Sequence, residues 1–390
     1  MRQPLEGVKV LDFSRVLAGP YCATLLADMG AEVIKIERPK YGDDSRHFGP
    51  FQNKESAYFE LFNRGKKSIA LNLKDDRDLE IVEQLVREAD IIVENFRPGV
   101  MKKLGLDYEK MKAVNPRIIY TSISGFGQYG PYSQRPAYDL VAQAMGGMTS
   151  ITGHPNDPPT RVGSSLGDMS GALYGAFGSM VALYHRERTG EGQHVDVAMM
   201  DTIFSMLETN VLRYTISGEN PGRIGSRHPI STPFDIYQAK DGYIVIAVAN
   251  DSLFKRLCET IGREDLITDP RFITDPLRTK HEKELKGILE KYLADYTVEE
   301  AEEMIGIKAG IPCSKIYTIQ DVVADEHSRI REMVFEVEHP RAGKMTMVGN
   351  PVKLSKTPPQ VKKVAPALDE HREEIMEHLN KSVGSVEYGL

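Results

Sequence analysis

Short apolar runs alternate with longer helical segments between residues 8 and 216, and this alternation constrains the fold more than any other feature. Strands that alternate with helices form parallel sheets with helices on both faces. The predicted strands are Val8–Phe13, Val33–Glu37, Ser68–Leu73, Ile91–Glu94, Ile118–Ser122 and His194–Ala198. The predicted helices are Tyr21–Met29, Asp75–Glu88 and, approximately, Met169–Arg188 and Met199–Ile216. The expected fold class is α/β, with a Rossmann-like, doubly wound parallel sheet.

The length of the chain indicates more than one domain, because 390 residues exceed the ~250–300 at which one core stops growing. A Gly- and Pro-rich linker at Ser217–Pro233 follows the first part of a large domain, expected at residues 1–215. A smaller α+β domain is expected at 226–325, and residues 330–390 are expected to return to the large domain. Elements predicted beyond the linker are strands Tyr243–Val248 and Lys344–Val348 and helices Glu282–Tyr296 and, approximately, Asp369–Leu379.

Composition excludes several classes of partner. A net charge of −7 gives no electrostatic basis for nucleic-acid binding, which requires a basic face. Three widely spaced cysteines, Cys22, Cys258 and Cys313, indicate reduced thiols rather than disulfides or a zinc site. The first residues lack the apolar core of a signal peptide, and no run approaches the ~18 apolar residues of a membrane span. We therefore expect a cytoplasmic protein that binds no metal and no membrane.

One glycine-rich segment matches a nucleotide-binding motif only superficially. Gly125–Gly130 reads G-x-G-x-x-G after a predicted strand, but Pro131 and Pro136 follow where a dinucleotide fingerprint requires a helix. After the first strand, where that fingerprint belongs, the chain reads Ser14-Arg-Val-Leu-Ala-Gly-Pro20. An NAD-dependent enzyme or a non-catalytic nucleotide-binding module remains a remote alternative, and it would require a helix that opens directly after Gly130.

Other segments suit an adenine nucleotide that carries an additional phosphate. Arg38 follows the second strand, where NAD enzymes place an acidic residue on the ribose and an arginine accommodates a ribose phosphate. Asn95 and Phe96 follow another strand and offer an amide and an aromatic face, and Lys103 adds positive charge nearby. Solvated surface charges and an ordinary turn are the alternative interpretations of these residues.

Asp168 is the candidate for chemistry. It lies among glycines at the start of the predicted helix near Met169, and no Ser-His pair, C-x-x-C or H-E-x-x-H motif accompanies it. Any reaction at this position must therefore use a carboxylate alone. A carboxylate is already ionised at neutral pH and can attack a thioester without a general base. The alternative interpretation is helix capping, because aspartate is a common N-cap residue.

A series of ordered motifs gives the chain a family resemblance. The motifs are Leu17-Ala-Gly-Pro20, Gly30-Ala-Glu-Val-Ile-Lys-Ile-Glu-Arg-Pro39, Asn63-Arg-Gly-Lys-Lys67, Asn95-Phe-Arg-Pro-Gly99, Ser124-Gly-Phe-Gly-Gln-Tyr-Gly-Pro131, Gly167-Asp168, Thr189-Gly-Glu-Gly-Gln193 and Lys240-Asp-Gly242. Over about residues 1–360 the chain resembles the class III coenzyme A (CoA) transferases, the family of formyl-CoA transferase and carnitine-CoA transferase.

The resemblance implies a Rossmann-like large domain built from both chain ends, a small domain between them, and an interlocked homodimer. It implies that Asp168 is the nucleophile. The reaction would move CoA from an acyl-CoA, such as succinyl-CoA or another short dicarboxyl- or hydroxyacyl-CoA, to a small carboxylic acid. CoA would be a substrate, with no permanently bound cofactor. The positions that the resemblance assigns to the CoA site are Leu17, Arg38, Leu71, Asn95, Phe96, Lys103 and Tyr138.

The chain departs from the oxalate-using members of the family at two places. A basic residue precedes their equivalent of Tyr138 by two positions, where this chain has Pro136, and their glycine-rich loop is replaced around Arg227–Pro233. Both departures argue against oxalate or formate specificity. His47 and His228 lie in predicted loops near candidate sites, and solvated loop residues are the simpler interpretation of both.

The 2-methylacyl-CoA racemases of the same superfamily are the alternative function. They exchange the α-proton of the acyl group, so they require a second acid or base besides the aspartate. The resemblance places a histidine of that family immediately before the position of Asp139, where this chain has Tyr138. A tyrosine with a reference pKa near ~10 is poorly suited to general base work at neutral pH, which favours the transferase.

Overall fold

The computed structural model describes residues 2–361 and 363–387, and the chain forms two compact units. The first unit comprises Met1–Thr149, Arg161–Glu219 and Glu326–Leu390, and the second comprises Ser150–Thr160 and Asn220–Asp325. No helix in the described part of the chain is long and apolar enough to cross a membrane. The three cysteines are free thiols.

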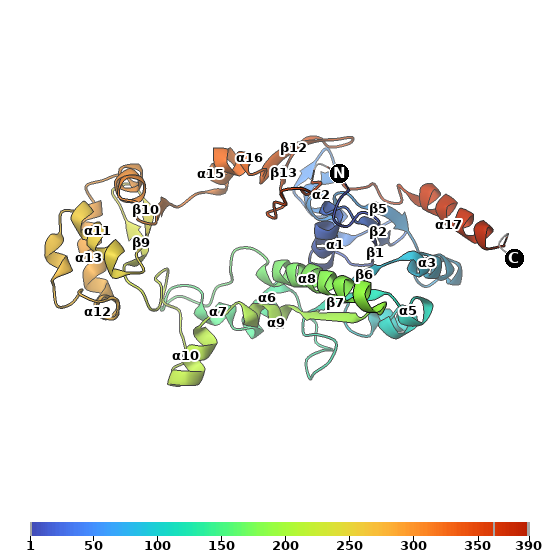
Figure 1. Cartoon of the computed structure of the whole chain (residues 1–390), viewed down its shortest axis with the longest axis horizontal. Coiled ribbons are helices and arrows are strands. Elements are labelled where there is room, and N and C mark those ends of the chain that lie inside the picture. Colours follow the sequence, from blue (N-terminus) through green and yellow to red (C-terminus); the bar gives the residue numbers. More distant parts are fainter. Residues whose placement is uncertain (1, 362, 388–390) are drawn as a thin grey trace. The chain divides into compact units, whose positions relative to one another are not determined.

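A six-stranded parallel sheet forms the centre of the first unit (Figure 1). Its strands are β1 (Lys9–Asp12), β2 (Glu32–Glu37), β5 (Lys67–Ala70), β6 (Ile91–Glu94), β7 (Ile119–Ser124) and β8 (His194–Ala198). They lie in the order β5-β2-β1-β6-β7-β8, which is the 3-2-1-4-5-6 order of dinucleotide-binding folds. The prediction of a parallel α/β sheet is confirmed, and the strand order reverses between β1 and β6.

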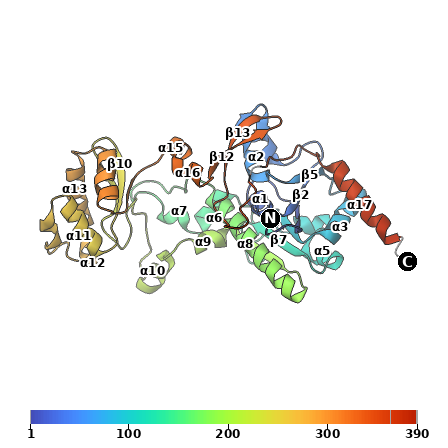
Figure 2. The ribbon, with the colours of Figure 1, turned by 45° about the horizontal axis from the view of Figure 1, so that its top comes forward.

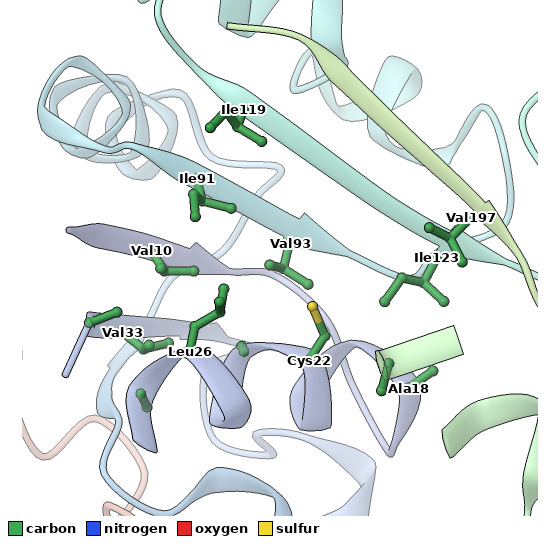
Figure 3. Close-up of a cluster of buried hydrophobic side chains, with 14 of the residues drawn as sticks. Val10, Ala18, Cys22, Leu26, Val33, Ile91, Val93, Ile119, Ile123 and Val197 are labelled. Atoms are coloured by element: carbon green, nitrogen blue, oxygen red, sulfur yellow. The ribbon is translucent and has the colours of Figure 1, made fainter. Parts of the chain in front are cut away.

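Helices α1 (Ala18–Asp28) and α8 (Leu166–Thr189) lie side by side against one face of this sheet (Figures 1 and 2). Figure 3 shows Cys22 and Leu26 of α1 pointing toward Val10 and Val93 of the strands. The glycines of α8 permit its close approach: a Cβ at Gly175 would lie only 2.8 Å from Cδ1 of Ile123. The small-residue face of this helix is therefore a packing surface, as its composition predicts.

The opposite face of the sheet is covered by α3 (Asp76–Glu88), α5 (Tyr108–Val114) and the C-terminal helix α17 (Arg372–Glu387). Alternate strand residues turn to this side, so Leu11 packs here whereas its neighbour Val10 packs against α1. Ile375 and Leu379 of α17 enter the same core. The C-terminal segment thus covers a sheet that the N-terminal half supplies.

A β-hairpin of the C-terminal segment packs next to α2 (Ala57–Asn63) in the first unit. Its strands are β12 (Val334–His339) and β13 (Gly343–Val348), and Nε2 of the buried His339 lies 3.2 Å from Oε1 of Glu60. Two backbone N–H groups donate to Nδ1 of His339, which assigns the ring proton to Nε2. Shorter elements complete the unit: β3 (Phe51–Gln52), β4 (Glu55–Ser56), α4 (Val100–Leu104), α6 (Asp139–Met145) and α16 (Glu326–Ile330).

The second unit has its own core around a three-stranded antiparallel sheet. The sheet contains β9 (Phe234–Gln238), β10 (Tyr243–Ala247) and β11 (Cys313–Lys315), with β10 in the middle. The surrounding helices include α11 (Asp251–Thr260), α12 (Asp275–Lys280), α13 (Glu282–Leu293), α14 (Val298–Ala301) and α15 (Ile319–Ala324). Arg278 is fully buried here and donates to the carbonyls of Thr232 and Phe272.

The structure departs from the sequence predictions in one predicted helix and in several strands that were not predicted. The single helix predicted at Met199–Ile216 is two helices, α9 (Met199–Ser205) and α10 (Asn210–Ser217). Glu208 between them has a φ of 52°, a left-handed conformation that ends helical hydrogen bonding. Strands β9, β11 and β12 were not predicted; β11 has only three residues, and all three strands pair with antiparallel partners that lie apart from them in the sequence.

Four buried charges lie at the carboxyl end of β1. Nζ of Lys66 lies 2.8 Å from Asp12, and Nζ of Lys35 lies 3.6 Å from Asp12 and 2.9 Å from Asp43. Lys66 also donates to Asn63 Oδ1 and to two backbone carbonyls. Burial alone would raise the pKa of Asp12, but the two lysine charges outweigh it and hold that pKa below its usual value. The Asn63–Lys67 motif is therefore structural in this chain.

We expect Lys66→Met to reduce the free energy of unfolding by about 3–5 kcal/mol, because it leaves the buried Asp12 and Asn63 without a principal partner. Urea unfolding followed by circular dichroism measures this loss. Lys344→Met is the matched control: it removes an ammonium from an exposed pair with Glu336, worth less than ~1 kcal/mol. Equal effects of the two substitutions would contradict a stabilising role for the buried cluster.

Candidate active site

Loops that follow the carboxyl ends of β1, β6 and β7 surround a cavity of about 300 Å³. The strand order reverses between β1 and β6, and the crevice at such a reversal is the usual ligand site of open α/β sheets. Five of the predicted site residues line this cavity together: Leu17, Asn95, Phe96, Tyr138 and Asp168.

The loop between β1 and α1 forms one wall and is held in an unusual conformation. Val16 has a φ of 69°, which is rare for a β-branched residue, and its N–H donates to the buried carboxylate of Asp43. Gly19 lets this loop fold against the helix start, since a Cβ there would lie 2.1 Å from the Cβ of Ser14 and 3.3 Å from Cγ of Asn95. The side chain of Asn95 in turn makes two hydrogen bonds to Arg15. Its Oδ1 accepts the N–H of Arg15, and its Nδ2 donates to the carbonyl of Arg15.

Asp168 is the third residue of α8, and helix capping does not explain it. The helix begins at Leu166, three residues before the predicted start, and its N-cap position is Ser165. The carboxylate of Asp139, from α6, accepts the N–H of Gly167 at 2.7 Å and so satisfies a donor of the first turn. Among the described residues, none donates a hydrogen bond to the Asp168 carboxylate.

The surroundings of Asp168 favour the protonated form of its carboxyl. Burial, and to a smaller extent the negative charge of Asp139, raise the pKa of Asp168 to about 7. The carboxylate of Asp139 itself accepts hydrogen bonds from the N–H of Gly167 and from Nε2 of Gln143. The carboxylate of Asp139 is therefore committed to structure, whereas the carboxyl of Asp168 lines the cavity and is available for chemistry.

A second cavity of about 500 Å³ continues from the first along the ends of β2 and β5. Arg38 and Leu71 line it, and Phe96 and Arg15 line both cavities, so the two meet at these side chains. The guanidinium of Arg15 lies 5.4 Å from the ring centroid of Phe96, within cation–π distance. The combined space offers a cation-lined compartment next to the compartment that contains Asp168.

Three residues considered in the sequence analysis do not line either cavity. Lys103 is exposed on α4, next to the cavity-lining Leu104. His47 packs on Tyr41, with ring centroids 4.5 Å apart, and His228 of the second unit stacks on Phe234.

The structure also adds residues that the sequence analysis did not single out. Arg15 lies three residues after β1, a position that could have identified it, because ligand groups gather at the carboxyl ends of parallel strands. Arg135 also lines the Asp168 cavity, and it directly precedes Pro136 in the sequence. Tyr58 is a neighbour of Asp168: burial first, and then the charge of that carboxylate, raise the pKa of its phenol. No motif in the sequence indicated Tyr58.

Comparison with known proteins gives consistent matches over nearly the whole chain. The family model described as CoA-transferase family III matches residues 5–372. The chain is 45% identical to acetyl-CoA:oxalate CoA-transferase of Acetobacter aceti, over 94% of this chain and 93% of that protein. It is 40% identical to succinyl-CoA:mesaconate CoA-transferase of Haloarcula marismortui, over 98% of each.

A solved structure shares the fold as well as the sequence. The crystal structure of a CAIB/BAIF family protein from Brucella suis superposes with a TM-score of 0.86 at 36% identity, covering 97% of this chain and all of that one. The NAD-dependent alternative has no support in these matches, and Gly125–Gly130 opens no helix, since α6 begins only at Asp139. The chain belongs to CoA-transferase family III and is a CoA-transferase.

Proposed function

We propose that this protein transfers CoA from an acyl-CoA to a carboxylic acid, with Asp168 as the nucleophile. The observation that carries the proposal is the position of this carboxyl. It lies in the cavity at the carboxyl ends of the parallel strands, with no hydrogen-bond donor among the described residues and a pKa raised by burial. A desolvated carboxylate of raised pKa is more basic, and hence more nucleophilic, than one in water.

In the first half-reaction an oxygen of Asp168 attacks the thioester carbonyl carbon. The carbon–sulfur bond breaks, CoA leaves as a thiolate, and an acyl-aspartyl anhydride remains. The thiolate then attacks the aspartyl carbonyl carbon, the anhydride carbon–oxygen bond breaks, and the donor acid leaves as a carboxylate. The enzyme now holds CoA as an aspartyl thioester.

The acceptor carboxylate repeats these steps in reverse order. It attacks the aspartyl thioester and displaces the CoA thiolate, which then attacks the acyl carbonyl of the new anhydride. Asp168 is regenerated as a carboxylate, and no proton, metal or nucleoside triphosphate is consumed. Asp168 lies in the first turn of α8, where the positive end of the helix dipole stabilises negative charge on the reacting oxygens.

The two cavities divide the CoA molecule between them in this proposal. Arg38 and Leu71 in the larger cavity would hold the nucleotide end, with the guanidinium near a phosphate. Leu17, Asn95 and Phe96 would line the path of the thioester arm toward Asp168. Tyr138 is exposed at the mouth of the smaller cavity, and Lys103 would act only as a nearby positive charge.

We propose a dicarboxylic acid as one of the two acids exchanged. Oxalate and mesaconate, the acids in the names of the two relatives, are both dicarboxylic. Arg135 supports such a ligand, because it lines the Asp168 cavity, and its guanidinium stacks on Tyr132 and pairs with no carboxylate in the described part of the chain. The expectation against oxalate, based on Pro136 and the loop at Arg227–Pro233, stays a prediction.

We further propose that two copies of the chain form the interlocked homodimer that the family resemblance implies. The support is a row of apolar side chains at helical spacing on the outer face of α8, all of them exposed: Leu173, Phe177, Val181 and Tyr184. A contiguous apolar row of this kind on a soluble protein indicates a surface that a partner covers.

Replacing the nucleophile should separate chemistry from binding. Asp168→Asn is expected to reduce CoA transfer by several orders of magnitude while it leaves the affinity for CoA and the thermal midpoint nearly unchanged. Incubation of the wild type with an acyl-CoA and hydroxylamine should place a hydroxamate on the peptide that contains Asp168, as mass spectrometry can detect. Substantial turnover in a folded Asp168→Asn protein would refute the covalent mechanism.

The pH dependence should follow the ionisation of Asp168. Only the carboxylate attacks, so kcat/KM should fall as pH drops below about 7, the value to which burial and Asp139 raise this pKa. Asp139→Asn removes the neighbouring charge and keeps an acceptor for Gly167 N–H, so it should move this fall to lower pH. An unchanged profile in Asp139→Asn would contradict the electrostatic role of Asp139.

A panel of carboxylic acids, mixed with succinyl-CoA in deuterated water, tests the substrate class and the racemase alternative together. We expect dicarboxylic acids to acquire CoA with ping-pong kinetics. Arg135→Gln should raise the KM for the acid more than the KM for succinyl-CoA. A 2-methylacyl-CoA should keep its α-proton over the same interval. Rapid α-deuteration without CoA exchange would instead assign the protein to the racemases.

A further inference from the structure

Two arginines that line the cavities share a single carboxylate. Nη1 of Arg15 lies 3.1 Å from Oδ2 of Asp44, and Nη2 of Arg38 lies 2.6 Å from Oδ1. Each oxygen of Asp44 is thus directed at one guanidinium. Arg15 lines both cavities, Arg38 lines the larger one, and Asp44 lines the cavity that contains Asp168. The three side chains stand where the two cavities meet.

Asp43, the residue before Asp44 in the same loop, has a structural role that Asp44 does not share. Asp43 is buried, pairs with Lys35, and accepts the N–H groups of Val16 and Ser45. In the described residues Asp44 accepts from Arg15 and Arg38 alone, and from no backbone group. Its carboxylate is therefore not needed to hold the loop, although it is adjacent in sequence to one that is.

The pairs that Asp44 makes are weak and easily exchanged. The side chains of Arg15 and Arg38 are 49% and 57% exposed, and that of Asp44 is 32% exposed. Ion pairs open to water contribute little, because solvent screens them and both side chains lose rotamer freedom. One negative charge also leaves two guanidiniums only partly neutralised. A phosphate carries more charge and more acceptor oxygens than a carboxylate and binds guanidinium in a bidentate manner.

We propose that Asp44 is an internal counter-ion that occupies Arg15 and Arg38 in the empty site and gives way to a phosphate group of CoA. This inference rests on the proposed function, since it takes CoA as the ligand. Because Asp44 must release the arginines before phosphate can bind them, it lowers the affinity for CoA and speeds the release of acyl-CoA product. Free carboxylic acids carry the same group as Asp44 without its tether, so they compete poorly for these arginines.

The test compares CoA binding to the wild type and to Asp44→Asn by isothermal titration calorimetry. Asn keeps the size of the side chain and removes the competing charge, so the Kd for CoA should fall about three- to tenfold. Glu191→Gln is the matched control. It makes the same change of charge at an exposed residue just before β8, at the opposite edge of the sheet, and should leave the Kd unchanged. Asp44→Ser, of smaller volume, should reproduce the gain.

Ligands that lack parts of CoA show which of its phosphate groups competes with Asp44 for the two arginines. Pantetheine, which has no phosphate, should bind equally to both proteins. If 3′-dephospho-CoA keeps the gain, Asp44 competes with the diphosphate; if it loses the gain, Asp44 competes with the ribose phosphate. In an Arg15→Ala/Arg38→Ala background, Asp44→Asn should have less effect than in the wild type, because the competition it relieves is gone.

Unchanged or weaker CoA binding in Asp44→Asn would overturn the inference and would mean that Asp44 orders the arginines for the ligand. An equal gain for pantetheine would overturn it as well. Failure of the proposed function looks different, because no carboxylic acid of the panel would then acquire CoA from succinyl-CoA, whatever Asp44→Asn does to the Kd for CoA.

Discussion

The ion cluster of Asp12, Lys35, Lys66 and Asp43 is the interaction on which the site depends most. It lies at the carboxyl end of β1, and all four side chains are excluded from water. Buried charges of this kind are stable only when each is paired and hydrogen-bonded, so the cluster allows one arrangement of the surrounding loops. Through Asp43 it holds Val16 in its left-handed conformation and thereby fixes the wall that carries Leu17 and Arg15.

Charge is arranged differently on the two sides of that wall. The cluster charges are buried and paired, whereas Arg15, Arg38 and Asp44, which line the cavities, are partly exposed and only weakly paired. The pairs that Arg15 and Arg38 make with Asp44 are open to water and contribute little stability, and Asp168 has no hydrogen-bond donor among the described residues. A site that must bind a polyanion, react with it and release it benefits from this division, because rigid positioning and easily exchanged contacts come from separate groups of residues.

The position of Asp168 follows from how α8 packs. Glycines on one side of the helix let it approach β7, and the carboxylate of Asp139 binds its first turn in place of an N-cap side chain. The same carboxylate raises the pKa of Asp168. One contact between α6 and α8 therefore helps to position the carboxyl and adds to the effect of burial on its pKa.

The sequence by itself determined the α/β class and most of the strands, and Ile91–Glu94 and His194–Ala198 agree with the structure at both ends. This succeeded because apolar periodicity is a local property that records which residues face a core. The sequence also singled out Asp168, which lines the cavity, and its role as the nucleophile stays a proposal. Only the tertiary structure decided that Asp139 supports Asp168, that Tyr58 is its neighbour, and that Asp43 and Asp44 differ in role. Those facts depend on which strand ends meet and on what is buried, and residues distant in sequence settle both.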